Sequence, residues 1–318
     1  MEKIIAPVDR PLLRNELTAE KFFRNTNKAN NEIYIVNAHN SPNIMREIGR
    51  LRELSFRQGG GGSGHEIDVD EFDFMEKPYE QLIVWDTDAE EIIGGYRFIQ
   101  GKNVVIKPDG QPKMAMEHLF NFSPEFIQTD LSATMELARA FVQPKYQSVQ
   151  MGLKSLFALD NLWDGIGALI ATSSDIKYLI GKVTIYSTMK EEARNAIIFF
   201  LDKFFGSRTG KITAKNIVEI SEKEQKTLTQ FFSEKDYKDN YRLLHNYVRR
   251  FGEAIPPLIH GYIELSSSMQ TFRTGLDCDF GNIYDTGMMI TVDDIYTAKR
   301  QRYVETFLDS HSGETPKL

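Results

Sequence analysis

Three carboxylates stand close together in the first quarter of this chain. Asp68, Asp70 and Asp73 follow a run with five glycines in six positions, 59 to 64. Carboxylates this close repel one another when they are ionised, so they need solvent, a metal ion or cationic side chains around them. The pattern therefore predicts either a cation site or a cluster in which aspartates pair with arginines to shape a pocket.

Two alternative functions would use the same stretch. A calcium loop of the EF-hand type needs glycine at its sixth position and glutamate at its twelfth, and DVDEFDFMEKPY has neither. His65 and Asp70 match the His-x4-Asp spacing of glycerolipid O-acyltransferases, but no phosphate-binding motif follows, so we interpret this match as chance. We predict no metal site.

A second pair of charged residues, Glu136 and Arg139, lies in the apolar segment MELARAFV. Burial in a strand would raise the pKa of the Glu136 carboxyl, which could then take a proton directly or through a water. The alternative is an internal ion pair between Glu136 and Arg139 that orders the strand.

The glycine run is typical of a flexible connector between domains. Here it leads at once into the aspartates instead of into a fresh polar start. We therefore interpret it as a lid that orders when donor or acceptor binds, and keep a domain linker as the alternative.

The elements that must position these residues predict an α/β fold. In order they are a strand (33–39), a helix (41–57), a hairpin (80–100), a short helical link (118–127), a central strand ending before Pro144, a long helix (151–173) and a strand (176–187).

The domain prediction follows from what comes next. Residues 187–254 are helical and charged, and we interpret them as an insertion, because the strand expected near 285–295 has no sheet of its own to join. We predict an N-terminal arm (1–32), one domain (33–308) and a disordered tail (309–318).

Composition narrows the function classes. The chain has 318 residues, a formal charge of −7 and one cysteine, Cys278. The charge gives no pull toward nucleic acid, and a single cysteine suits a reducing compartment. With no apolar run long enough for a signal peptide or a membrane span, we expect a cytoplasmic protein, with peripheral contact at the inner membrane face left open.

Four ordered motifs carry a family resemblance: LRELSFR, IDVDEFD, IVWDTDAEEIIGGYR and MELARAFVQPKY. The pattern resembles acyl-carrier-protein-dependent N-acyltransferases of the GNAT superfamily. Two branches share it, the acyl-homoserine-lactone synthases and the amino-acid N-acyltransferases of ornithine- and glycine-lipid synthesis. LWDGIGALI, KYLIGKVTI and IPPLIHGYIELSSS are similar to later segments of the second branch.

The resemblance implies a GNAT-type fold, with a central mixed sheet flanked by helices and a helical insertion before the last strands. It implies transfer of a long fatty-acyl chain from an acyl carrier protein thioester to the amino group of a small amino acid of the glycine or ornithine class, the first step of aminolipid synthesis. No bound cofactor is expected.

By position, the resemblance also implies a set of site residues. Arg52 and Phe56 would shape the acyl and donor side, Arg97 would close the hairpin's second strand, and Glu136 with Arg139 would be catalytic. The remaining donor- or substrate-binding residues would be Asp68, Asp70, Asp73, Phe141, Val142, Gln147 and Gly152. Main-chain N–H groups from Phe141 to Gln143 could polarise the thioester if the strand splays there.

The chain departs from the superfamily at its phosphate loop. QSVQMG keeps Gln147 and Gly152 of the Arg/Gln-x-x-Gly-x-Gly/Ala turn, with Gln150 at the middle glycine. A side chain there hinders close approach of the backbone to a pyrophosphate, which disfavours free acyl-CoA as donor.

Several alternatives stay open at this level. A homoserine-lactone synthase would require S-adenosylmethionine, and a non-catalytic acyl or carrier-protein binding module would explain the poor phosphate loop. Basic residues at Arg208, Lys211 and Lys215 could steer an acidic carrier protein. The apolar stripe along 197–205 favours a core helix, with shallow bilayer contact as the alternative.

Overall fold

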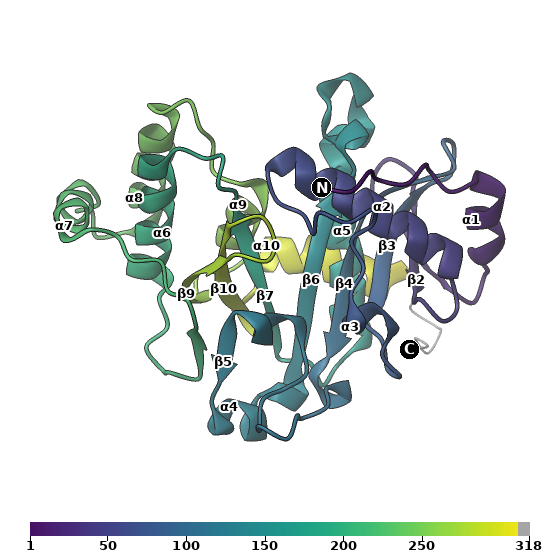
Figure 1. Cartoon of the computed structure of the whole chain (residues 1–318), viewed down its shortest axis with the longest axis horizontal. Helices are drawn as coiled ribbons and strands as arrows, with labels where there is room; N and C mark the ends of the chain where they lie inside the picture. Colours follow the sequence, from purple (N-terminus) through teal and green to yellow (C-terminus); the bar gives the residue numbers. More distant parts are fainter. Residues whose placement is uncertain (311–318) are drawn as a thin grey trace.

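The computed structural model describes residues 1–310 and is built around one eight-stranded sheet (Figure 1). The strand order is β1-β2-β3-β4-β6-β7-β10-β9, and only the β6–β7 pair is parallel. The strands are β1 (Phe22–Asn25), β2 (Glu32–Val36), β3 (Glu80–Asp86), β4 (Glu91–Gln100), β6 (Thr134–Val142), β7 (Tyr178–Ile185), β9 (Gln270–Asp277) and β10 (Ile283–Thr291).

Helices cover both faces of this sheet. The helices are α1 (Arg10–Glu16), α2 (Pro42–Gly59), α3 (Glu71–Phe74), α4 (Pro124–Thr129), α5 (Leu153–Thr172), α6 (Glu191–Phe205), α7 (Glu222–Phe231), α8 (Tyr237–Arg249), α9 (Pro257–Ile263), α10 (Thr297–Arg300) and α11 (Thr306–Ser310). Helix α2 crosses in front of the sheet in Figure 1 and closes one core, whereas α5 belongs to the core on the opposite face. The α/β prediction is confirmed.

The sheet opens between its two parallel strands. Strands β6 and β7 pair only where Thr134–Leu137 meets Tyr178–Gly181, although both continue for several residues. On the other side of β6 the register with β4 shifts between Gly95 and Arg97, and Arg139 adopts a φ of 49°. Such a bulge bends the strand away from its neighbour. The splay creates a gap in the middle of the sheet.

Helices α6, α7 and α8 follow β7 along the chain and form the lobe at the left of Figure 1. The apolar stripe of α6 is core: Ile197, Phe200 and Leu201 are fully buried and Phe205 nearly so. Ile198 is also buried, and Phe199 packs against Phe232. The core interpretation of this stripe is therefore confirmed.

One link differs from the sequence prediction. Residues 118–127, expected to be helical, contain strand β5 (Phe120–Phe122), which pairs with β8 (Ile212–Ala214) in a separate two-stranded sheet. The alternating Phe-Asn-Phe buries both rings, and its partner strand lies about ninety residues away, so a local pattern could not reveal it.

The N-terminal arm is part of the fold. Strand β1 forms one edge of the sheet, and Arg24 donates to the carbonyl of Asp164 on α5. The Asp164 carboxylate accepts bonds from the backbone and the side chain of Asn27, at 2.8 and 2.6 Å. This buried latch joins the arm to the far face of the sheet.

Asp309 and Ser310 close helix α11, and residues 311–318 of the expected tail lie outside the described residues. Within 1–310, no helix combines the length and the apolar character needed to cross a bilayer.

Candidate active site

The aspartates are held by a short helix of their own. Asp70 caps α3, where its Oδ1 accepts from the Phe72 N–H at 3.0 Å, and Asp73 returns the bond by accepting from the Asp70 N–H at 3.1 Å. This reciprocal arrangement is a capping box. The capping box holds the carboxylates of Asp70 and Asp73 next to each other, and both face Arg97.

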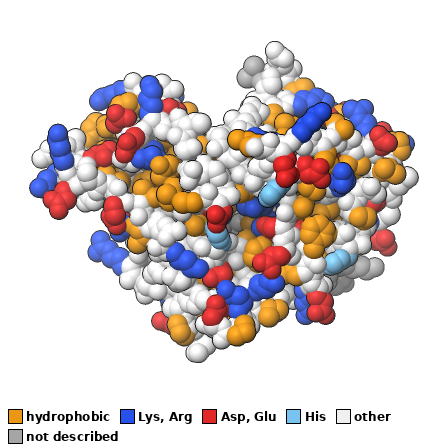
Figure 2. Space-filling model, viewed as in Figure 1, with side chains coloured by type: hydrophobic (Ala, Val, Ile, Leu, Met, Phe, Trp, Pro, Cys, Tyr) orange, Lys and Arg blue, Asp and Glu red, His pale blue; other side chains and the backbone are white. Residues whose placement is uncertain are grey.

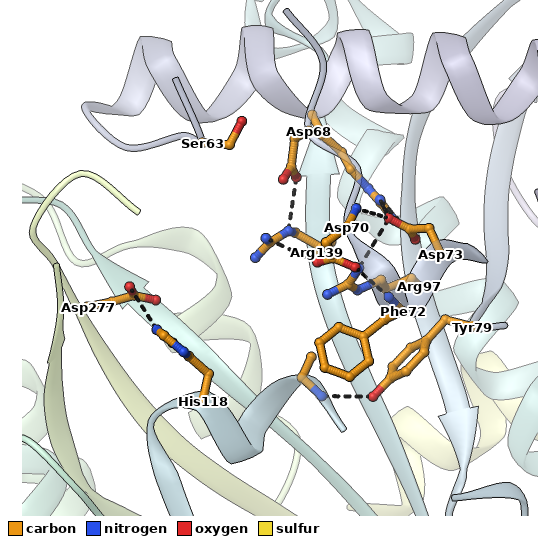
Figure 3. A network of polar contacts seen from close by, with 12 residues as sticks. Ser63, Asp68, Asp70, Phe72, Asp73, Tyr79, Arg97, His118, Arg139 and Asp277 are labelled. Carbon is orange, nitrogen blue, oxygen red and sulfur yellow. Dashed lines mark hydrogen bonds and ion pairs between the residues drawn. The ribbon is translucent and has the colours of Figure 1, made fainter. Parts of the chain in front are cut away.

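Arginines from three distant elements converge on these carboxylates (Figure 3). Arg52 of α2 lies 3.2 Å from Asp73, and Arg97 of β4 lies 2.7 Å from Asp70 and 3.3 Å from Asp73. Three arginines meet three aspartates in this network, so their formal charges cancel.

The third arginine, Arg139, reaches the edge of the network. Its Nε lies 2.9 Å from Asp68, and its Nη2 lies 3.5 Å from Asp70. Burial alone would raise the pKa of Asp70, but Arg97 and Arg139 hold it at about 2. The prediction of an aspartate–arginine cluster is borne out as geometry.

Sequence reasoning missed two partners of the network on and beside β3. Gln81 accepts from Arg52 at 2.5 Å and donates to Asp73 at 3.0 Å. Tyr79 places its ring beneath Arg97, whose guanidinium carbon lies 5.2 Å from the ring centre. No spacing in the sequence predicts a role for either residue, because each of them contacts residues from other helices and strands.

The Glu136 carboxylate accepts hydrogen bonds from two main-chain N–H groups and from one side chain. Its Oε1 accepts from Met116 N–H at 2.7 Å, and its Oε2 accepts from the Tyr79 hydroxyl and from Ala115 N–H at 3.3 Å. Burial raises the pKa of this carboxyl, and the hydrogen bonds from Tyr79, Met116 and Ala115, with the nearby charge of Arg97, only partly offset it. The catalytic role of Glu136 stays a prediction, and its geometry favours positioning the 115–118 turn.

The alternative for this pair, an ion pair between Glu136 and Arg139, does not form in the described part of the chain. Arg139 pairs with Asp68 and Asp70 instead. The bulge at Arg139 interrupts the alternation along β6, so the two side chains reach different partners.

The gap between β6 and β7 holds a cavity of about 600 Å³. Its wall on the α5 side is apolar, with Ala158, Leu159 and Leu162 from the helix and Leu258 from α9. From α2, Ser55, Phe56 and Gln58 reach the cavity. The molecule is indented between α2 and the lobe of α6 to α8 (Figure 2).

The predicted site residues divide into two sets around this cavity. Five of them line it: Phe56, Arg139, Phe141, Val142 and Gln147. The others stand behind the wall or at the start of α5: Arg52, Asp68, Asp70, Asp73, Arg97, Glu136 and Gly152. Arg139 is the residue that belongs to both the cavity wall and the charged network.

The main chain at the end of β6 is engaged in hydrogen bonds. The Gln143 N–H donates to the Ile93 carbonyl at 2.9 Å, so it is not available to a thioester. The Val142 carbonyl accepts from Ser55 and Gln147, at 3.2 and 2.6 Å. Gln147 thus ties down the end of β6.

The cavity wall formed by β7 and β10 carries polar residues that sequence reasoning missed. Lys182 and Thr184 of β7 and Asp285 of β10 line the cavity. The Thr184 hydroxyl donates to Asp285 Oδ1 at 2.6 Å, and Lys182 pairs with Asp285 and with Asp277, the latter at 3.2 Å. The alternation of Lys182 and Thr184 in an apolar strand was the available signal.

The glycine run is a packing device, which contradicts the linker interpretation. A Cβ at Gly59 would come within 2.5 Å of the Tyr186 ring, and one at Gly60 within 2.8 Å of the Thr188 side chain. Glycines here let α2 approach the far strand across the cavity mouth.

The loop after these glycines is tied to α2. The fully buried Glu53 accepts from Ser63 N–H at 2.9 Å and from Gly64 N–H at 2.8 Å. Burial would raise the pKa of Glu53, but its bonds from Arg57 and Ser63 lower it. The lid interpretation stays a prediction, and any opening would have to break these bonds.

Two of the three basic residues expected to attract a carrier protein, Lys211 and Lys215, are already paired with carboxylates. Lys211 pairs with Asp130 at 2.8 Å and with Glu125 at 3.1 Å, and Lys215 pairs with Glu117 at 2.8 Å. Acidic and basic side chains are interspersed over the face drawn in Figure 2. Local neutralisation weakens the case for a docking patch at this place.

The chain is similar to known acyltransferases. Residues 51–155 match the acetyltransferase (GNAT) domain family. A glycine N(alpha)-acyltransferase of Bacteroides thetaiotaomicron is 47% identical over 98% of this chain and 92% of its own length. A glycine N(alpha)-acyltransferase of Phocaeicola vulgatus is 45% identical over 98% of this chain and 95% of its own.

Solved structures give weaker likenesses. FeeM, an N-acyl amino acid synthase from uncultured soil microbes, is 13% identical, with a TM-score of 0.40 over 82% of this chain and 92% of its own. The acyl-homoserine-lactone synthase LasI is 14% identical, with a TM-score of 0.28 over 48% of this chain and 71% of its own.

Proposed function

Because the chain belongs to the GNAT-type glycine N(alpha)-acyltransferase family, we propose that it transfers a long fatty-acyl chain from an acyl carrier protein thioester to the amino group of glycine. The chain is an enzyme of amino-acid N-acylation. The choice of glycine, of the carrier protein and of a long chain is the proposal.

The observation that carries the proposal is the cavity in the split sheet. An amine and a thioester must meet in a site that separates the lipid from the charged acceptor. The apolar wall formed by α5 and α9 suits the acyl chain, and the polar wall around Arg139 and Lys182 suits an amino acid. Both walls open into one cavity.

The start of α5 favours a carrier protein over free coenzyme A. A coenzyme A pyrophosphate would need main-chain N–H groups and cations there. Instead Leu153 and Leu156 are exposed, at 67% and 69%, and Lys154 is already held by Asp86 at 2.7 Å. An apolar rim whose lysine is already paired suits a protein-bound pantetheine arm, which carries no adenosine phosphates.

The product would be an N-acylglycine, an amphiphile with one anionic head and one long chain. Such a molecule partitions into a bilayer, because each buried CH₂ contributes about 0.8 kcal/mol. This supports a first step in aminolipid synthesis and work near the inner membrane face.

The test is a product analysis. Purified protein is incubated with palmitoyl carrier protein and an equimolar mixture of amino acids, and N-acyl products are identified by mass spectrometry. We expect N-palmitoylglycine as the main product, no dependence on S-adenosylmethionine, and slower reaction with palmitoyl-CoA.

Three outcomes would overturn parts of the proposal. A different dominant acceptor would remove glycine, and equal kcat/KM with palmitoyl-CoA would remove the preference for the carrier protein. A requirement for S-adenosylmethionine would place the chain with the homoserine-lactone synthases.

A further inference from the structure

The polar wall of the cavity has an uneven charge. Lys182 is flanked by two carboxylates, Asp277 and Asp285, which are 3% and 0% exposed. Asp277 also faces His118, whose Nε2 lies 3.5 Å from its Oδ1, whereas the cationic partner of Asp285 is the shared Lys182. Asp285 can therefore take a further positive partner.

Asp285 is the carboxylate of this set that lines the cavity. Its Oδ1 accepts from Thr184, and its Oδ2 contacts the Lys182 ammonium, so each oxygen has one partner and a lone pair left over. An oxygen held in this way can accept an N–H from a cation placed in the cavity.

A positively charged side chain from β6, Arg139, also lines this cavity. Arg139 is 18% exposed, lines the cavity and stacks on the Phe280 ring, with its guanidinium carbon 4.3 Å from the ring centre. Its Nε and Nη2 face Asp68 and Asp70, and a guanidinium has five N–H donors, so its Nη1 can donate to an anion in the cavity while the aspartates keep their partners.

We infer that Asp285 and Arg139 form the amino-acid subsite, with Asp285 binding the ammonium group and Arg139 the carboxylate of the acceptor. Lys182 and Thr184 are positioning residues that hold Asp285. The inference rests on the proposed function, because it names where that reaction takes its acceptor.

The subsite accounts for the protons of the reaction. The ammonium gives one proton to the Asp285 carboxylate, which passes it to solvent, and the free amine attacks the thioester carbonyl carbon. The C–N bond forms, the C–S bond breaks, and the second nitrogen proton goes to the leaving thiolate. The products are the amide and the free thiol.

The test compares acceptor and donor kinetics. In Asp285→Asn, we expect kcat/KM for glycine to fall at least a hundredfold while KM for palmitoyl carrier protein stays within twofold. Asp279→Asn is the matched control, since that carboxylate lies on the turn that precedes β10 but is 80% exposed and outside the cavity wall. A glycine kcat/KM within threefold of the wild type in Asp285→Asn would overturn the inference.

A second variant covers the case in which Asp285→Asn does not fold. Thr184→Val keeps the side-chain shape and removes the bond to Asp285 Oδ1. We expect a threefold to tenfold rise in KM for glycine in a protein with unchanged circular dichroism, and an unchanged KM would count against the subsite.

The role of Arg139 is tested by a ratio that does not depend on how much protein is folded. The preference for glycine over glycinamide, which lacks the carboxylate, should fall at least tenfold in Arg139→Gln. An unchanged preference would remove Arg139 from the subsite. If the wild type acylates no amino acid at all, the proposed function fails, whereas these outcomes address the subsite alone.

Discussion

Arg139 and Phe280 face each other across the open seam of the sheet, with the guanidinium carbon 4.3 Å from the ring centre. Arg139 comes from β6, and Phe280 comes from the turn between β9 and β10. Phe280 also packs edge-on against Phe56 of α2, with ring centres 5.3 Å apart. The ring therefore roofs the polar end of the cavity and limits the room beside the acceptor.

Phe280→Ala should widen acceptor choice. Removing the ring leaves space next to Arg139, so we expect the ratio of kcat/KM for alanine to that for glycine to rise about tenfold, in the range expected when a pocket gains room for a methyl group. The measurement is product formation with each amino acid. Phe22→Ala, far along the chain at the edge strand, is the control, and an unchanged ratio in Phe280→Ala would show that size selection lies elsewhere.

Glu136→Gln should affect stability more than turnover. The new NH₂ would face the Tyr79 hydroxyl and the Ala115 N–H, two groups that now donate to the carboxylate. We expect a loss of about 1–3 kcal/mol in the free energy of unfolding. Because the side chain does not line the cavity, kcat should stay within about tenfold. A folded variant that lost a thousandfold in kcat would restore Glu136 as the base.

Gly60→Ala should be more damaging than Gly64→Ala. Both glycines have positive φ, 97° and 82°, so both variants carry the same backbone strain. Only at Gly60 does the added Cβ approach another side chain, Thr188, at 2.8 Å. We expect an extra loss of about 1–3 kcal/mol at Gly60 in urea unfolding. Equal losses would mean that the contact with Thr188 relaxes at no cost.

The Asp164 latch should make stability depend on pH in a recognisable direction. Burial raises the pKa of Asp164 to about 6, and the bonds from Asn27 only partly offset this. A raised folded-state pKa contributes stability below pH about 4, and that contribution is lost as the pH rises through about 6.

Asp164→Asn removes this titration. Between pH 4 and pH 7 the wild type should lose up to about 3 kcal/mol relative to the variant, which corresponds to a shift of about two pKa units. Paired thermal or urea unfolding at several pH values measures the difference. A difference that stays constant with pH would contradict the raised pKa.

Leu156→Ser should weaken use of the donor without affecting the fold. Leu156 is exposed at the start of α5, one turn before Leu159 of the cavity wall. We expect a several-fold rise in KM for palmitoyl carrier protein and an unchanged KM for glycine. Val105→Ser, at a position 63% exposed elsewhere, is the matched control. The same KM in both variants would rule out a donor rim at this helix.

Much of the fold could be predicted from local patterns. The helix that begins at Ser41-Pro42, the hairpin closed by Asp-Thr-Asp and the strand stopped by Pro144 are each specified within a few residues, by caps, turns and periodicity. The strand at Phe120–Phe122 was missed because its partner is Ile212–Ala214, and pairing over such a separation has no local signal.

By itself, the sequence determined which side chains are charged and in which elements they lie, and therefore that Asp70 and Asp73 would need solvent or positive charge around them. Only the tertiary structure decided which arginines meet them, and that Glu136 turns to Tyr79 instead of to Arg139. It also brought Lys182 and Asp285 together from adjacent strands 103 residues apart. Register and bulges set those contacts, and they depend on the whole sheet, whereas caps and periodicity depend on neighbours in the chain.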